Sequence, residues 1–287
     1  MSSGSRVMSS APLISIVIAT RNAAGDLPRC LDSIRRQTFR EFEVLVADGA
    51  STDGTIDIVK SAADVVTFWQ SEPDTGPYDA RNKVLPRARG EWICFLGADD
   101  WLWDERALER LAPHLRTAAP RYRVVYSRLR QVDPEGRLVA EAGEPWERSR
   151  ARFRSYCCLP HPGLMHHRSL FDLHGKFDER FKMAGDYELL LRELKTRDAL
   201  FVPALTAAMG FRGQTTSPEY FYGLLVETRE ALARHGLRPP PLRWAYWMFC
   251  AWIYVKLHAL LGDRKARRLA DAYRVLTLRK PRYSGSK

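Results

Sequence analysis

Two adjacent carboxylates, Asp99 and Asp100, directly follow an apolar run and directly precede a tryptophan, Trp101. Neighbouring carboxylates repel each other, so a compensating partner is expected beside them. Mg²⁺ and Mn²⁺ prefer hard oxygen ligands and bridge phosphate groups, so this pair predicts a divalent metal site next to a diphosphate. The alternative is that Asp100 is the N-cap of a helix that begins near Asp104.

A third carboxylate stands in a similar place. Asp48 follows the apolar run 42–47 and precedes a turn rich in Gly and Ser. A carboxylate at a strand end can accept hydrogen bonds from a base or a ribose, or it can ligate a metal. The alternative is that Asp48 only caps the turn. Because such residues recur at several strand ends, the sequence favours a ligand site.

These side chains must be positioned by a sheet. Apolar, β-branched runs predict buried strands, and the segments between them have helical spacing. The strands are expected at 13–19, 42–47, 64–69 and 91–96, and the helices at 26–38, 55–61 and 78–88. This alternation predicts an α/β fold with a parallel, doubly wound sheet, whose ligands bind beyond the carboxyl ends of the strands. One crevice is therefore expected to be lined by Thr20–Arg21, Asp48–Gly49, Ser71–Glu72 and Gly97–Asp99.

The pattern changes after residue 115. Two β-rich runs within 121–141 flank the sequence DPEG, which is typical of a hairpin turn. An amphipathic helix is expected at 184–196, one or two strands at 199–211 and a further helix at 217–236.

The composition of the chain indicates the number of domains and the cellular compartment. The chain has 287 residues, enough for one large domain or two small ones, and its five cysteines show no disulfide or zinc spacing. This usage is typical of a reducing, cytoplasmic compartment. The segment 1–11 is polar and lacks the apolar core of a signal peptide, so we expect it to be disordered and the protein not to be exported.

Positive charge is concentrated in the tail. The net charge is +11, and the segment 238–287 alone has twelve Lys and Arg against two Asp and Glu. Within 242–261 the uncharged core is only twelve residues long, whereas a spanning helix needs roughly 20. Its tryptophans and the basic helix expected at 263–280 predict a peripheral anchor on an anionic membrane surface. The residues concerned are Trp244, Trp247, Trp252, Arg264, Lys265, Arg267 and Arg268. The alternative is a helical pair packed on the domain with a solvated basic face.

Four segments together resemble a known family. They read ISIVIATRN, EVLVADGASTDGT, SEPDTGPYDARNKVLPRARGEWICFLGADDWL and FDERFKMAGDYELLLR. In this order they closely resemble the family 2 glycosyltransferases of the GT-A fold, which build bacterial surface polysaccharides. The resemblance covers residues 12–217 and implies a Rossmann-like, mostly parallel central sheet with flanking helices. It divides the chain into a nucleotide-binding half at 12–115, an acceptor-binding half at 116–217, and C-terminal amphipathic, basic helices at 218–287.

The resemblance implies roles for residues at the strand ends. It implies that the nucleotide-sugar is held by Ala19, Thr20, Arg21, Asp48, Arg81, Asn82, Ala98 and Asp99. Of these, Asp99 matches the position that ligates Mg²⁺ or Mn²⁺ on the diphosphate. Gly97 stands where the family's motif has its first aspartate, so this chain departs from the full motif there.

The resemblance also implies a catalytic base at Asp186, with Glu188 as the alternative base and Gly185 leaving space for an acceptor. An inverting displacement needs one base for the acceptor hydroxyl, and the metal can stabilise the departing nucleoside diphosphate. The alternative reading of Asp186 is a helix cap. His161 and Arg212 are expected to contact the diphosphate or the acceptor.

Together these features predict an inverting glycosyltransferase. It would move a sugar from a nucleotide-sugar, expected to be a UDP-sugar, to a saccharide or polyprenyl-diphosphate-linked acceptor at the inner face of the cytoplasmic membrane. The alternatives are a nucleotidyltransferase and a non-catalytic nucleic-acid-binding protein that uses the basic tail. The loop TRNAAGD is poor in glycine and basic residues for a triphosphate, and the strand-end carboxylates would repel nucleic acid. The oligomeric state stays open, with a dimer contact through the tail helices as one option.

Overall fold

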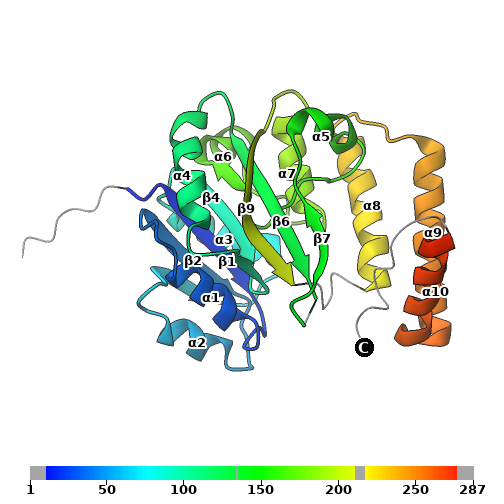
Figure 1. Ribbon diagram of the computed structural model, residues 1–287, viewed down its shortest axis with the longest axis horizontal. Coiled ribbons are helices and arrows are strands. Elements are labelled where there is room, and N and C mark those ends of the chain that lie inside the picture. The colour runs from blue at the N-terminus through cyan, green and yellow to red at the C-terminus, as the bar shows by residue number, and fades with distance from the viewer. Residues whose placement is uncertain (1–10, 134, 211–216, 277–287) are drawn as a thin grey trace, which may run out of the picture.

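The computed structural model describes residues 11–133, 135–210 and 217–276. Within these residues, nine strands form one mixed sheet in the order β3-β2-β1-β4-β8-β6-β9-β5, and β7 lies off this path and pairs with β6. Helices flank the sheet, and three C-terminal helices stand beside one another at one end of the molecule (Figure 1). The predicted α/β class is confirmed. The expectation for residues 1–11 falls almost entirely outside the described residues.

The N-terminal half contains the four predicted parallel strands. They are β1 (Ile14–Thr20), β2 (Phe42–Asp48), β3 (Phe68–Ser71) and β4 (Trp92–Gly97). The helices between them are α1 (Leu27–Arg35), α2 (Thr55–Ser61) and α3 (Pro77–Val84), followed by the short 3₁₀ helix η1 (Leu85–Arg87). The sheet separates two hydrophobic cores. Alternate residues of β1 explain this, because Ile16 packs in one core with α1 and Val17 packs in the other with α3.

Strand register brings the predicted crevice residues together. Thr20 is the register partner of Asp48, and Asp48 is the register partner of Ser71. On the other side of β1, Ala19 pairs with Gly97. The carboxyl ends of all four strands therefore meet at one edge of the sheet, as the alternation of strands and helices predicts.

The C-terminal half of the sheet is mostly antiparallel. Its strands are β5 (Asp100–Leu102), β6 (Val124–Val132), β7 (Leu138–Ala142), β8 (Met165–His167) and β9 (Leu200–Gly210). Its helices are α4 (Ala107–Ala118), α5 (Trp146–Phe153), α6 (Arg168–His174) and α7 (Gly185–Leu194). The predicted hairpin is confirmed as β6 and β7, and of the one or two strands expected at 199–211 the described residues form one, β9.

Two element boundaries differ from the sequence prediction. The third strand begins at Phe68, not at residue 64, because Val66 packs into the core while the chain is still turning after α2. The third helix ends at Val84 and continues only as η1, because Pro86 has no backbone N–H to extend an α-helix.

The chain ends in three helices, α8 (Pro218–Arg234), α9 (Pro241–Leu261) and α10 (Asp263–Leu276). In Figure 1, α8 lies nearest the sheet and α9 and α10 are outermost. None of the helices in the described part of the chain combines the length and apolar character needed to cross a bilayer. The end of the helix predicted for 263–280 lies outside the described residues.

Candidate functional site

Asp48 and Thr20 lie side by side at the carboxyl edge of the sheet. Asp48 is buried, and its Oδ2 accepts hydrogen bonds from Ser51 N (2.9 Å) and Ser71 Oγ (2.7 Å). Asp48 therefore does cap the turn that follows β2 and ties β2 to β3. Thr20 Oγ1 is buried without a hydrogen-bond partner among the described residues. Nearby, Ala19 is partly buried and Arg21 is exposed.

Asp99 and Asp100 fold back on the end of β4. Asp100 is buried, and its Oδ2 accepts a hydrogen bond from Gly97 N at 2.7 Å. A Cβ atom on Gly97 would lie 2.8 Å from Asp99 Oδ1 and 3.1 Å from Asp100 Oδ2. Glycine at this position therefore gives both carboxylates room. The helix-cap alternative for Asp100 is wrong, since α4 begins at Ala107 and has no side-chain cap.

The electrostatics of this corner suit a divalent cation. Burial and the neighbouring Asp99 raise the pKa of Asp100 to about 8. Asp100 Oδ1 is buried and has no hydrogen-bond partner in the described chain. The described residues contain no cluster of three or more metal-ligating side chains. The hard oxygens of Asp99 and Asp100 therefore fit Mg²⁺ or Mn²⁺ only as a cation that completes its coordination with diphosphate and water.

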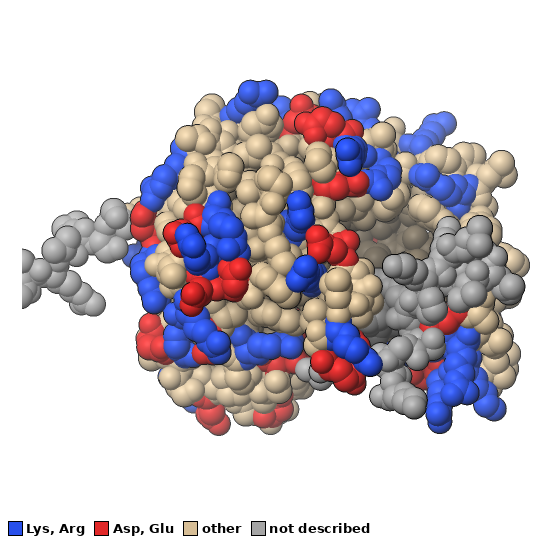
Figure 2. Space-filling view, in the orientation of Figure 1, with Lys and Arg blue, Asp and Glu red and all other residues tan. Residues whose placement is uncertain are grey.

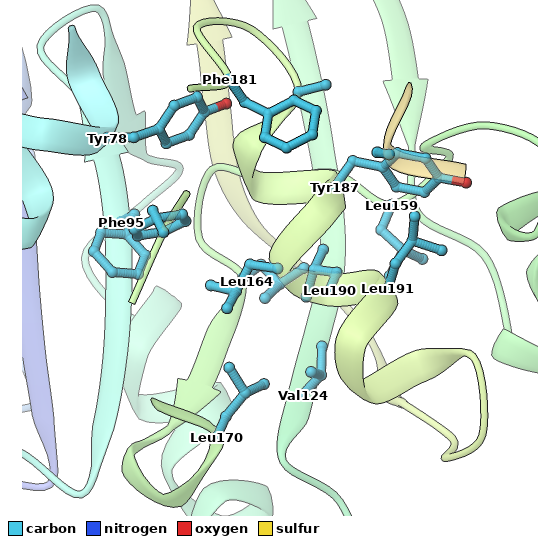
Figure 3. Packing of buried hydrophobic residues seen from close by; sticks show 14 of the residues in the cluster. Tyr78, Phe95, Val124, Leu159, Leu164, Leu170, Phe181, Tyr187, Leu190 and Leu191 are labelled. Atoms are coloured by element: carbon cyan, nitrogen blue, oxygen red, sulfur yellow. The ribbon is translucent and has the colours of Figure 1, made fainter. Parts of the chain in front are cut away.

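Asp186 lies in the first turn of α7, under a tyrosine from the opposite half. The Tyr78 hydroxyl is 3.2 Å from Asp186 Oδ1 and 3.0 Å from Met183 O, and it donates toward both. Figure 3 shows the hydroxyl of Tyr78 directed toward the segment that carries Phe181. A Cβ on Gly185 would lie 2.8 Å from the Tyr78 ring. The space at Gly185 is therefore filled by Tyr78, and the expectation that it leaves room for an acceptor is wrong.

Burial raises the pKa of Asp186, although the Arg81 guanidinium and hydrogen bonds from Tyr187 N and the Tyr78 hydroxyl oppose this shift. A carboxylate with a raised pKa is a stronger proton acceptor than an exposed one. Asp186 therefore combines a raised pKa with a contact to Tyr78, which goes beyond the role of a helix cap.

His161 and Arg81 lie beside this carboxylate. His161 Nδ1 is 3.4 Å from Asp186 Oδ2, yet neither ring nitrogen of His161 has a hydrogen-bond partner in the described chain. Burial, with Arg81 nearby, lowers the pKa of His161, so the imidazole is neutral at pH 7. Arg81 Nε is also buried and unpartnered among the described residues, and the guanidinium lies 5.3 Å from the Phe95 ring centre. A cation, a carboxylate and an imidazole therefore lie close together in a buried setting.

Asn82 is placed differently from the expectation. The Asn82 amide donates to Phe177 O and Glu179 Oε1, both at 2.9 Å, and Asn82 Oδ1 accepts from Phe177 N at 3.0 Å. Asn82 therefore holds α3 against the chain that leads to α7, and both of its amide N–H groups are used in these internal contacts.

The alternative base, Glu188, is buried between Arg192 and His235, whose Nε2 is 3.0 Å away. This carboxylate is used in internal contacts and is not available for proton transfer. Arg212 lies outside the described residues. Ala98 is buried at the end of β4, directly before Asp99.

Two tyrosines of this site were missed in the sequence. Tyr78 stands three residues before Arg81 on α3, so helical spacing alone could have identified it. Tyr220 lies in the first turn of α8, where burial, followed by the charges of Asp186 and Glu227, raises its pKa to about 12. No sequence motif indicates that Tyr220 lies near Asp186.

The C-terminal helices present an apolar surface, here called the C-terminal face. Its exposed apolar side chains on α9 are Leu242, Tyr246, Phe249, Trp252, Leu260 and Leu261. Phe249 and Trp252 stack with ring centres 6.4 Å apart. At the start of α10, Arg264, Lys265 and Arg268 are exposed, and Figure 2 shows Lys and Arg gathered at the lower right of the molecule.

Three residues of the predicted anchor make contacts within the protein. Trp244 is only 4% exposed and packs in the main core, so its assignment to the membrane is wrong. Trp247 is half-buried against Trp244 and Tyr156. Arg267 pairs with Asp263 at 2.7 Å. Trp244 and Trp247 lie three residues apart on α9 and therefore share the face that packs inward.

The sequence is similar to those of known glycosyltransferases. The sequence profile described as "Glycosyl transferase family 2" matches residues 15–171. A "PGL/p-HBAD biosynthesis glycosyltransferase" of Mycobacterium bovis is 35% identical over 185 residues, which cover 63% of this chain and 70% of that protein. The chondroitin synthase of Pasteurella multocida is 28% identical over 183 residues, covering 63% of this chain and 19% of that protein.

Solved structures share the fold. The mannosyltransferase PcManGT from Pyrobaculum calidifontis, in complex with GDP-Man and Mn²⁺, has a TM-score of 0.64 at 19% identity and covers 95% of this chain and 82% of its own. S. aureus TarS 1-349 in complex with UDP-GlcNAc has a TM-score of 0.61 at 20% identity, with 82% of this chain and 70% of that chain covered.

Proposed function

Because the chain belongs to glycosyl transferase family 2 and has the GT-A fold, we propose that it is an inverting transferase that moves a sugar from a nucleotide-sugar to an acceptor hydroxyl. One observation carries the proposal. Buried polar atoms without partners in the described chain gather around the crevice, on Thr20, Arg81, Asp100 and His161. An unsatisfied buried polar group costs about 1–3 kcal/mol, so a group of them indicates a polar ligand that supplies the missing contacts.

The donor would lie along the carboxyl edge of the sheet. The nucleotide would be held by Ala19, Thr20, Arg21 and Asp48. UDP is the proposed nucleotide. Ala98 and Asp99 would lie at the diphosphate, where Asp99 would hold Mg²⁺ or Mn²⁺. A divalent cation bound there would neutralise the negative charge on the departing diphosphate. The TarS complex with UDP-GlcNAc and the PcManGT complex with Mn²⁺ support this arrangement in the same fold.

Asp186 would act as the base. The acceptor oxygen forms a bond to the anomeric carbon while the bond from that carbon to the diphosphate oxygen breaks, and Asp186 takes the hydroxyl proton. A single displacement of this kind inverts the anomeric configuration. The buried position of Asp186 supports its role as a base, because burial raises its pKa. Tyr78 would hold the carboxylate in place through its hydroxyl. Arg81 and His161, beside Asp186, would contact the diphosphate or the acceptor.

The acceptor would be a saccharide, and we propose that this saccharide is linked to polyprenyl diphosphate. The C-terminal face supports this, because exposed aromatic side chains beside Arg264, Lys265 and Arg268 suit an anionic lipid surface. The enzyme would then bind peripherally to the inner face of the cytoplasmic membrane, where lipid-linked substrates are exposed to it. Nucleic acid would not be a partner.

A panel of nucleotide-sugars tests the proposal. Thermal unfolding of the full chain would be followed with each nucleotide-sugar in the presence of Mg²⁺, Mn²⁺ or EDTA. At ligand concentrations of 100 times Kd, we expect about 2.7 kcal/mol of added stability with the correct donor and metal. Nucleoside triphosphates without a sugar serve as the comparison. Stabilisation by triphosphates but by no nucleotide-sugar would contradict the proposal.

A further inference from the structure

One carboxylate on α8 binds the backbone that carries the proposed base. Glu227 Oε2 accepts hydrogen bonds from Met183 N and Ala184 N, both at 2.8 Å, and from Lys182 N at 3.0 Å. Glu227 Oε1 also accepts from Lys182 N at 2.9 Å. Three consecutive peptide N–H groups therefore converge on a side chain 43 to 45 residues further along the chain. The next residues are Gly185 and Asp186.

The N-terminus of α7 depends on this contact. The residue before the helix is Ala184, which has no side chain able to cap the free N–H groups. Glu227 supplies the cap from another helix, and its negative charge lies at the positive end of the α7 dipole. A carboxylate engaged by three N–H groups is committed to this contact, which argues against Glu227 as a proton acceptor in the reaction.

The segment 182–184 is held from two sides. On one side, the Tyr78 hydroxyl donates to Met183 O. On the other side, Gly223 stands one turn before Glu227 on α8, and a Cβ there would lie 2.7 Å from Met183 Sδ. The glycine lets α8 approach closely enough for Glu227 to reach the backbone. Tyr78 and Glu227 therefore fix the same peptide, one through its carbonyl and the other through its N–H groups.

We propose that Glu227 is a positioning residue for transfer, and that it orients Asp186 by fixing peptide 182–184. This inference rests on the proposed role of Asp186 as the base. Glu227 acts only through the backbone, so donor binding at the sheet edge should not depend on it. The orientation of the proton-accepting carboxylate should depend on it strongly, because small misplacements of catalytic groups reduce rates steeply.

Steady-state kinetics of Glu227→Ala, Glu227→Gln and Glu230→Gln test the inference. Glu230 is the matched control, because it is a second glutamate on α8, three residues after Glu227. Its side chain is exposed and pairs with Arg234. We expect Glu227→Ala to lower kcat by about 10- to 100-fold at unchanged KM for the donor. Glu227→Gln keeps one acceptor oxygen and should lower kcat less. Glu230→Gln should retain the wild-type kcat.

Hydrogen exchange provides a readout that does not depend on activity. The amides of 182–184 should exchange faster in Glu227→Gln than in Glu230→Gln, while the amides of β1 should not change. If Glu227→Ala does not fold, the glutamine variant still decides the question. Wild-type kcat together with wild-type exchange at 182–184 in Glu227→Gln would overturn the inference. Absence of transfer by the wild-type enzyme would instead overturn the proposed function.

Discussion

Replacing Gly185 by alanine should destabilise the protein, because the added methyl group would meet the Tyr78 ring. The new Cβ would lie 2.8 Å from two ring carbons and 3.0 Å from a third. The ring has little room to retreat, since Tyr78 is 5% exposed and packs against Phe177 with ring centres 5.3 Å apart. Overpacking of this kind costs roughly 1–3 kcal/mol.

A smaller effect acts in the opposite direction. Gly185 is the first residue of α7, and alanine in a helix is favoured over glycine by about 0.5–1 kcal/mol. Movement of the ring would also lengthen the hydrogen bond from Tyr78 to Asp186, at a cost of about 1 kcal/mol. The net expectation for Gly185→Ala is a loss of about 1–3 kcal/mol in the free energy of unfolding, with lower kcat.

Urea unfolding measures this loss in Gly185→Ala, both alone and in a Tyr78→Leu background. Gly25→Ala is the control, because no atom lies within 4 Å of the Cβ that it would add, and it should not lower stability. Tyr78→Leu removes most of the ring, so Gly185→Ala should cost less in that background. If Gly185 instead provided space for an acceptor, Gly185→Ala would raise KM for the acceptor and leave stability unchanged. That result would refute the packing described for Tyr78.

Three further predictions concern the metal, the base and the membrane. Asp99→Asn should weaken metal-dependent donor binding by at least about 10-fold, measured by titration with and without Mn²⁺, whereas metal-independent binding of equal strength would contradict the metal assignment. Because burial raises the pKa of Asp186 and a base must be ionised, activity should fall as the pH drops through that raised pKa. Tyr78→Phe should move this acidic limit of the kcat–pH profile upward, and an unchanged profile would count against the contact. Phe249→Glu should reduce binding to anionic vesicles by at least about 10-fold, because burial of an aromatic side chain contributes roughly 1.5–3 kcal/mol. Leu138→Glu, at an exposed apolar residue on the hairpin, is the control, and equal vesicle binding by both variants would argue against the C-terminal face.

Much of the fold follows from local pattern. Apolar runs predict all four parallel strands, and their polar ends meet at one edge because parallel strands share a direction. Only the start of the third strand differs from the prediction, because Val66 is buried in a turn and a short apolar run does not distinguish a buried turn from a strand.

The partners of the site residues could not be predicted in the same way. Asn82 is within a run typical of the family, but its amide binds Phe177, 95 residues away. Gly185 looks like open space in the sequence, whereas Tyr78 fills it. Trp244 belongs to a helix rich in aromatic residues, yet the packing of α9 turns it into the core. Each of these contacts depends on tertiary packing that local spacing does not encode.

One variant tests the proposed role of Asp186 as the base most directly. In Asp186→Asn, donor affinity and single-turnover transfer would be measured side by side on the same preparation. We predict donor affinity within about twofold of the wild type and transfer lowered by about 10²- to 10⁴-fold, the usual contribution of a general base. Transfer at the wild-type rate, or loss of donor binding alone, would contradict the assignment of Asp186 as the base.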